Sequence, residues 1–203
     1  EIGVRLVGSE MCIRDRPGDI KYKDLNHDGV IDSNDQAPIG YNPVPEMTFS
    51  LAAGLNWKGI DFSILLQGAA RSSIYLQQDI AWDNFWGNYY EEHIGRWTPE
   101  TAATATYPRF TKAATAAHPN YYKSDYWLKD SKYLRLKNIQ LGYTIPRKLL
   151  KKFGVRSLRV YANAYNLFTW DNVKKVDPES SNNSNGQFYP QQKVINFGIN
   201  LNF

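Results

Sequence analysis

The sequence has little of what would support several common classes of protein. It contains one cysteine, Cys12, so no internal disulfide is possible and the cellular compartment cannot be read from cysteine usage. No stretch approaches the roughly 18 consecutive apolar residues of a membrane helix, which excludes helical membrane proteins only. The net charge of +4 is small and scattered, and it gives no argument for binding nucleic acid. A signal peptide is also absent, so we expect an exported protein of this sequence to have its true N-terminus elsewhere.

Catalytic groups are equally sparse. The only histidines are His27, His93 and His118, and each is far from the others in the sequence. Glu91 and Glu92, close to a tryptophan, have the composition of a paired-carboxylate glycosidase site. Adjacent residues on a helix, however, point about 100° apart, so these two carboxylates would not face one substrate. We therefore expect no catalytic residues and no enzyme.

What the sequence does contain is strict alternation, most clearly at its end. In residues 193–203, Ile and Phe residues alternate with Asn and Gly, which gives one apolar and one polar face. The run has about the length of a strand that crosses a bilayer at a tilt, roughly 9–11 residues. Taken alone, it is equally compatible with an edge strand of a soluble sandwich. The number of other segments with the same pattern decides between these interpretations.

Four further segments share this alternation. They are residues 47–57, 60–67, 133–145 and 158–165. Lys58 and Gly59 form a tight turn between the first two, and a phase slip predicts a bulge near Lys137 or Asn138. A short helix is expected from Pro146 to Gly154. The apolar side chains should form one continuous convex band that includes Phe49, Leu51, Phe62, Ile64, Leu141, Val160, Phe197 and Leu201.

The connections between these strands alternate strictly between long and short. In order they are residues 18–45, 58–59, 71–132, 146–155 and 171–192. Short periplasmic turns and long external loops are typical of outer-membrane barrels, whereas a soluble sandwich gives no reason for them. We therefore predict an all-β fold, an antiparallel transmembrane β-barrel fragment. It should be an open, curved sheet of about five long strands with long extracellular loops.

An acidic loop precedes the first strand and has the spacing of a calcium-binding loop. Oxygen-bearing side chains occupy loop positions one, three, five, nine and twelve, and Gly29 stands at position six, where a sharp turn is needed. The expected ligands are the side chains of Asp24, Asn26, Asp28, Asp32 and Asp35 and the backbone carbonyl of Val30. Asp35 replaces the glutamate of an EF-hand, and no flanking helix pair is evident, so the cation would have a structural role. The alternative is an Asx-rich turn without metal.

Residues 71–132 interrupt the strands with a long segment rich in tryptophan and tyrosine. A short helix is expected within residues 80–94. On a membrane barrel such a loop lies outside, where we expect Trp82 and Trp86 to contact a ligand or a lid protein. The aromatic rings could instead pack the loop on itself, and this is the expectation for most of them.

The first sixteen residues differ from the rest. Residues 4–16 read VRLVGSEMCIRDR, which resembles a translated sequencing adapter. We therefore expect residues 1–16 to be non-native and residues 17–203 to be the native segment, truncated at its N-terminus. The alternative is that residues 1–16 are the remainder of a native strand.

Six stretches in register resemble the C-terminal end of the SusC/RagA family of TonB-linked outer-membrane transporters of Bacteroidetes. They are residues 18–32 (GDIKYKDLNHDGVID), 62–68 (FSILLQG), 96–100 (RWTPE), 133–144 (YLRLKNIQLGYT), 158–168 (LRVYANAYNLF) and the terminal Phe203. Each is modest alone, and the resemblance spans residues 17–203. It implies a 22-stranded barrel with an N-terminal plug in the outer membrane, in contact with its lipid. It also implies coupling to the TonB complex through the missing N-terminal part.

The resemblance further implies import of a glycan or a peptide together with a SusD-like surface lipoprotein that closes the barrel. The sequence has no plug, so it can carry only part of that function. The competing hypothesis is a calcium-stabilised extracellular carbohydrate-binding or adhesion module, which would need a closed sandwich and would not explain the alternation of loop lengths.

Overall fold

The computed structural model describes residues 16–112, 118–174, 176–180 and 190–203. The chain divides into two units. The sheet unit comprises Tyr41–Ser73, Asp130–Glu179 and Tyr189–Phe203, and the loop unit comprises Glu1–Gly40, Ile74–Lys129 and Ser180–Phe188. Fifteen of the sixteen residues expected to be non-native lie outside the described residues; only Arg16 is described. Within the described part of the chain, no helix is both long and apolar enough to cross a membrane.

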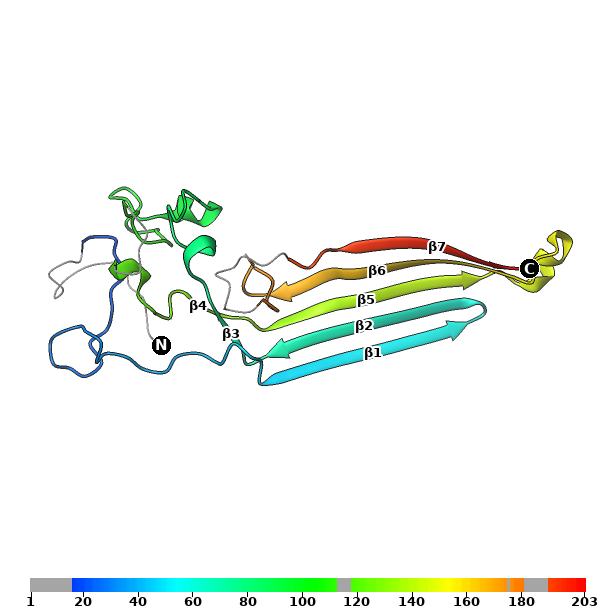
Figure 1. Ribbon diagram of the computed structural model, residues 1–203, viewed down its shortest axis with the longest axis horizontal. Helices are drawn as coiled ribbons and strands as arrows, with labels where there is room; N and C mark the ends of the chain where they lie inside the picture. The colour runs from blue at the N-terminus through cyan, green and yellow to red at the C-terminus, as the bar shows by residue number, and fades with distance from the viewer. Residues whose placement is uncertain (1–15, 113–117, 175, 181–189) are drawn as a thin grey trace. The chain divides into compact units, whose positions relative to one another are not determined.

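The sheet unit is built on one antiparallel sheet of five long strands in the order β1-β2-β5-β6-β7 (Figure 1). The strands are β1 (Met47–Trp57), β2 (Ile60–Ala70), β5 (Tyr133–Thr144), β6 (Ser157–Asp171) and β7 (Val194–Asn202). The alternating segments of the sequence therefore do become strands, and the predicted open sheet is confirmed. β1 and β7 form its two free edges.

The two short connections lie at the same end of the sheet, as antiparallel order requires. Lys58 and Gly59 join β1 to β2 with φ values of 47° and 89°, the left-handed conformation of a tight hairpin turn. β5 and β6 are joined through α1 (Arg147–Leu150) and η4 (Lys151–Phe153), and Gly154 ends this helical segment at φ 68°. The predicted short helix is thus present as one α-turn followed by one 3₁₀ turn, with its glycine in the left-handed position.

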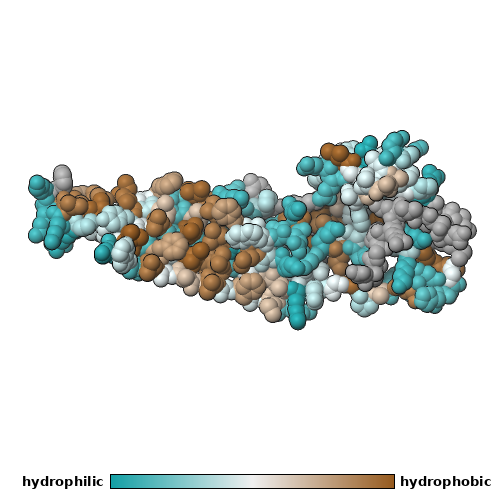
Figure 2. Space-filling model, turned by 180° about the vertical axis from the view of Figure 1, so that it is seen from behind, coloured by the Kyte–Doolittle hydropathy of each residue, from teal (hydrophilic) through white to brown (hydrophobic). Residues whose placement is uncertain are grey.

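The strand register places all the predicted band residues on one face. Phe62 lies opposite Leu141, Val160 opposite Ile199, and Leu158 opposite Leu201. Many of the large apolar side chains of this apolar face are exposed, up to 83% for Phe197, whereas Leu136 is buried. Apolar residues gather along the strands in Figure 2. Polar and small side chains occupy the opposite face, here called the polar face.

A bulge interrupts the alternation where the sequence predicts one. The register between β2 and β5 shifts between Leu65 and Leu66, and the register between β5 and β6 shifts between Leu136 and Asn138. Lys137 is left out of both pairings, and Asn166 and Leu167 of β6 are left out opposite it. The extra residue restores Leu136 to the apolar face, which explains the phase slip in the sequence.

The loop unit contains short elements and an aromatic interior. Its helical turns are η1 (Gln78–Ile80), η2 (Glu91–Gly95) and η3 (Pro119–Tyr121), and a separate two-stranded sheet pairs β3 (Ser73–Tyr75) with β4 (Leu128–Asp130). Of the short helix expected within residues 80–94, only the 3₁₀ helix η2 near the end of this range is present. Asn84, Trp86 and Gly87 all have positive φ values, which a helix cannot accommodate, so the chain turns between η1 and η2 instead.

Candidate functional sites in the loops and on the sheet

The interior of the loop unit is organised around a fully buried carboxylate. Asp83 has no exposed surface, and its Oδ2 accepts the backbone N–H of Thr111 at 3.0 Å. The Tyr121 hydroxyl donates to Oδ1, and the Tyr107 hydroxyl lies 3.2 Å from the same oxygen. Burial, followed by the nearby charge of Asp83, raises the pKa of Tyr107, so this hydroxyl keeps its proton at neutral pH. A carboxylate enclosed in this way stabilises the loop unit and is closed to a ligand.

A second buried network ties the start of the described chain to the long loop. The Nε of Arg109 forms an ion pair with Asp19 at 2.7 Å, and its Nη2 donates to the other carboxylate oxygen at 3.1 Å. Asn120, also fully buried, donates to Asp19 at 3.0 Å and accepts the backbone N–H of Ile20 at 2.9 Å. The segment that leads into the acidic loop is therefore fixed to residues about ninety positions later in the sequence.

The two tryptophans expected to contact a ligand have different environments. Trp82 is 4% exposed, and its ring packs against those of Tyr121 at 4.6 Å and Phe85 at 5.7 Å between centroids. Trp86 is 83% exposed and touches Phe85 edge-on at 5.9 Å. Trp82 thus packs the loop on itself, the alternative that the sequence left open. Contact with a ligand or lid protein stays a prediction, and only Trp86 has the exposure that it requires.

The acidic loop folds with its carboxylates directed at its own backbone. Asp24 accepts the N–H groups of His27 and Gly29, at 2.6 and 2.9 Å, and both of these residues have positive φ. Asp35 accepts the N–H groups of Leu25 at 2.7 Å and Asp32 at 2.9 Å. The hydrogen bond from Asp32, followed by that from Leu25, holds the pKa of Asp35 below its usual value. These bonds are those of an Asx-rich turn, and they also occur in cation-binding loops.

Each carboxylate oxygen has a second lone pair, so these hydrogen bonds leave the hard-oxygen donor set available to a cation. Across the described residues, no three His, Cys, Asp or Glu side chains are already gathered to hold a metal ion. The expected ligands also include Asn26 and the Val30 carbonyl, and calcium binding by this loop stays a prediction.

On the polar face of the sheet, an ion pair spans three strands near the short-turn end. Arg159 on β6 reaches across β5 to Asp61 on β2, with Nε–Oδ1 and Nη2–Oδ2 distances of 2.9 and 2.5 Å. Gly142 on β5 lies beneath this pair, and a Cβ there would come within 2.5 Å of the Asp61 carboxylate. The glycine therefore makes room for the ion pair, and the sequence alternation gave no indication of it.

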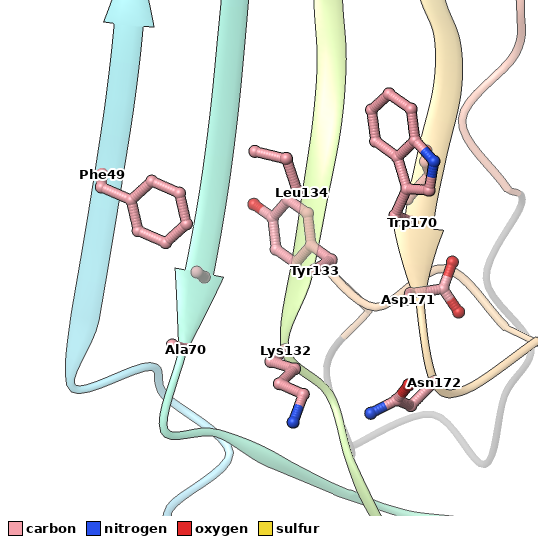
Figure 3. Close-up of a pocket in the computed structure, with 10 residues that line it drawn as sticks. Phe49, Ala70, Lys132, Tyr133, Leu134, Trp170, Asp171 and Asn172 are labelled. Atoms are coloured by element: carbon pink, nitrogen blue, oxygen red, sulfur yellow. The ribbon is translucent and has the colours of Figure 1, made fainter.

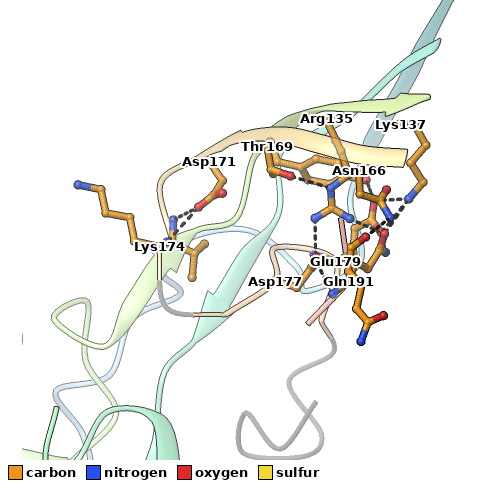
Figure 4. Close-up of polar contacts among 12 residues, drawn as sticks. Arg135, Lys137, Asn166, Thr169, Asp171, Lys174, Asp177, Glu179 and Gln191 are labelled. Atoms are coloured by element: carbon orange, nitrogen blue, oxygen red, sulfur yellow. Dashed lines mark hydrogen bonds and ion pairs between the residues drawn. The ribbon is translucent and has the colours of Figure 1, made fainter. Parts of the chain in front are cut away.

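At the opposite end of the polar face, a buried arginine holds the loop that follows β6 (Figure 4). The Arg135 side chain is 2% exposed and pairs with Asp177 at 2.8 Å and Glu179 at 3.2 Å. Its Nε donates to the Thr169 hydroxyl at 2.9 Å, and Lys137 lies 3.4 Å from Glu179. Burial alone would raise the pKa of Asp177, but the hydrogen bonds from Arg135 and from the Glu179 N–H hold it below its usual value. We call these residues the Arg135 cluster.

Sequence reasoning missed the Arg135 cluster and the two buried carboxylates of the loop unit. Arg135 and Asp177 are 42 positions apart, and Arg109 and Asp19 are 90 apart, so no local spacing links them. One signal was available: Arg135 is a charged residue beside a phase slip in an otherwise apolar and polar alternation. An inward charge at a bulge requires a partner from another segment.

Comparison with known proteins gives one consistent result. TonB-dependent receptor P26 of Formosa agariphila is 30% identical over 92% of this chain, and TonB-dependent receptor SusC of Bacteroides thetaiotaomicron is 26% identical over 93%. Among solved structures, the RagAB peptide importer in its open-open state has a TM-score of 0.68 with 21% identity over 92% of the chain and 21% of that chain. No family model matches the sequence.

Over nine-tenths of its length, the chain is similar to TonB-dependent receptors of the SusC/RagA type. Sequence relatives and the fold agree with the resemblance carried by the motifs, and they indicate an outer-membrane receptor rather than an enzyme. The chain spans about a fifth of the length of the curated relatives that it matches. In this receptor, the apolar face of the sheet is the face toward lipid, and the polar face is the one toward the interior of the barrel.

Proposed function

We propose that this chain forms one segment of the barrel wall of an outer-membrane importer that takes up a glycan or a peptide. The observation that carries the proposal is the similarity to TonB-dependent receptors over nine-tenths of the chain. The two-faced sheet supports it physically. An exposed apolar face suits lipid contact, and a polar face with an ion pair between Asp61 and Arg159 suits a hydrated interior.

We infer that the partners are a SusD-like surface lipoprotein and the TonB complex, the latter reached through parts of the receptor beyond this chain. The solved structures of similar fold are described as a peptide importer and a peptide transporter, which supports a peptide substrate for this receptor too. The glycan alternative rests on the motif resemblance. In either case the loop unit offers Trp86 as an exposed ring for contact with the substrate or the lipoprotein.

The test uses the full-length receptor in its native host. Uptake of fluorescent oligopeptides and oligosaccharides is compared between cells that lack the receptor gene and cells that carry it on a plasmid. Each comparison is made with and without a functional TonB. We expect uptake of one substrate class to need both the receptor and TonB. If neither class depends on the receptor while the barrel is present in the outer membrane, the import proposal is wrong.

The competing hypothesis, an adhesion or carbohydrate-binding module, lacks support. Such a module needs two sheets packed face to face around a core. In the described residues, the five long strands form a single sheet whose apolar face is exposed.

We also propose that the acidic loop binds calcium with a structural role. The supporting observation is its set of hard oxygen donors at the spacing of a calcium loop, with Gly29 at the bend. A weak site, with a dissociation constant on the order of 10⁻⁴–10⁻³ M, is sufficient outside the cell. In the full-length receptor, calcium should slow proteolysis of this loop and Asp28→Ala should remove the effect. Equal proteolysis in calcium and in EDTA would leave the loop as a turn only.

Finally, we propose that residues 1–16 are not native and that the gene continues upstream of Pro17 into the rest of the barrel and the plug. Genomic DNA sequenced across the codon for Pro17 tests this directly. Finding residues 1–16 encoded there in frame would contradict it.

A further inference from the structure

The apolar face carries a hollow at the end of the sheet where the long connections begin (Figure 3). Its volume is about 540 Å³. The register places Phe49, Ala70, Leu134 and Trp170, on four successive strands, on this same face. Ten residues line the hollow, and all of them belong to the sheet unit.

Small side chains on β2 create this hollow between two large rings. Gly68 and Ala70 lie on the apolar face at the end of β2, and neither residue reaches far from the backbone, while Ala69 between them belongs to the polar face. The Phe49 ring leans over Gly68, where an added Cβ would meet it at 2.3 Å, and Trp170 is on the far side of Leu134. The result is an apolar floor two strands wide between aromatic walls.

The rim of the hollow is polar and carries a cation. Lys132 and Asn172 line it just beyond the ends of their strands, and Asp171, whose carboxylate accepts the backbone N–H groups of Val173 and Lys174, lines it at the end of β6. Lys132 pairs with Asp130 at 2.9 Å, but its side chain remains 58% exposed, so its charge is available to a further anion. Trp170 stacks beside Phe168 at 6.2 Å, and Lys193 lies 5.9 Å from the Phe168 ring. An apolar floor with cations at its edge matches an amphiphile that has an acyl chain and an anionic head.

The position of the hollow in the membrane identifies the leaflet. A tilted strand of about eleven residues spans the apolar band of roughly 25 Å. One end of that band is marked by Trp57 at the short turn and the other by Phe168 and Trp170, as expected for aromatic girdles at the two interfaces. Because the long loops of outer-membrane barrels are extracellular, the hollow opens toward the outer leaflet at the depth of the lipid head groups.

We propose that this hollow is a binding site for one outer-leaflet glycolipid of the lipid A type. One acyl chain lies on the floor between Phe49 and Trp170, and a phosphate of the head pairs with Lys132. The site would fix a lipid beside the base of the long loop that connects β2 to β5.

The test uses the full-length receptor, purified from outer membranes in detergent and titrated with lipid A, with native mass spectrometry as the readout. Ala70→Leu fills the hollow and keeps the surface apolar. Because it displaces about two methylenes of the acyl chain, it should weaken the one-to-one complex by roughly tenfold. Ala53→Leu is the matched control, since Ala53 lies on the same face in the middle of β1 and should bind lipid A as the parent does.

Two charge variants test the head group. Lys132→Gln should weaken binding by about threefold, as expected for an exposed pair, whereas Lys58→Gln at the opposite interface should not. Asp130→Asn removes the competing carboxylate, keeps the oxygen that accepts the Lys132 N–H, and should strengthen binding. With lipid A that lacks phosphates, neither Lys132→Gln nor Asp130→Asn should change the affinity.

Several results would overturn the proposal. If Ala70→Leu and Ala53→Leu weaken lipid A binding equally, the bound lipid is ordinary boundary lipid and the hollow is not a specific site. Binding that is unchanged in Ala70→Leu, or that does not depend on phosphate, would also be decisive against it. The charge variants keep the test valid if Ala70→Leu fails to assemble.

Discussion

Asp83 is the residue on which the loop unit depends most directly. Its carboxylate receives the Thr111 N–H and the Tyr121 hydroxyl without any exposure to water. Asp83→Leu would leave these buried donors without an acceptor, and we expect it to destabilise the loop unit by roughly 2–3 kcal/mol. Limited proteolysis of the full-length receptor should then cut within residues 74–129 faster, while the barrel keeps its heat-resistant mobility in SDS gels. The exposed Glu91→Gln is the matched control, and an unchanged digestion rate in Asp83→Leu would contradict this role.

The contrast between Trp82 and Trp86 gives the second prediction at this scale. Trp86→Ala removes an 83% exposed ring, so it should reduce substrate uptake by the full-length receptor without changing its amount in the outer membrane. Trp82→Ala removes a buried ring that packs on Tyr121, and it should destabilise the loop unit by about 3 kcal/mol. Uptake kinetics together with proteolysis separate the two effects. Wild-type uptake in Trp86→Ala would leave that ring without a role in transport.

At the scale of the elements, the sequence predicts strands better than loops, for a physical reason. The alternation that defines β1 or β7 is local, and a single residue left out at Lys137 appears directly as a phase slip. The loop unit is instead held by pairs such as Arg109 with Asp19, whose members are distant in the sequence. No periodicity records such contacts, so the helix expected in residues 80–94 is present only as the short 3₁₀ helix η2, whereas the short helix after β5 was right.

The Arg135 cluster ties such a loop to the sheet, so removing the cluster should loosen that loop. Arg135→Ala leaves Asp177 and Glu179 without their main cation, at a cost of about 3 kcal/mol for a buried pair. The pKa of Asp177 should then rise, because burial remains while the hydrogen bond that lowers it is gone. Residues 177–191 of the full-length receptor should become more susceptible to protease, with the exposed Lys174→Ala as control. If proteolysis is the same in both variants, the cluster does not hold the loop.

At the scale of the whole molecule, the sheet could be predicted because the two environments of a membrane barrel determine the residue pattern of its strands. One face must suit lipid and the other must suit water, and every strand repeats that requirement with period two. The candidate sites were less foreseeable. The acidic loop has a recognisable spacing, but whether its carboxylates hold a cation depends on more than their order in the chain.

The open sheet also determines how this chain should behave when produced alone. β1 and β7 leave two rows of backbone groups unpaired, and exposed side chains such as Phe197 at 83% and Leu51 at 61% cover one face. Because unpaired edges and a large apolar surface both favour association, residues 17–203 expressed alone should aggregate in water. Detergent should cover the apolar face, and light scattering with and without detergent measures the difference. A monodisperse monomer in water would mean that the apolar face is covered in a way that a five-stranded open sheet does not allow.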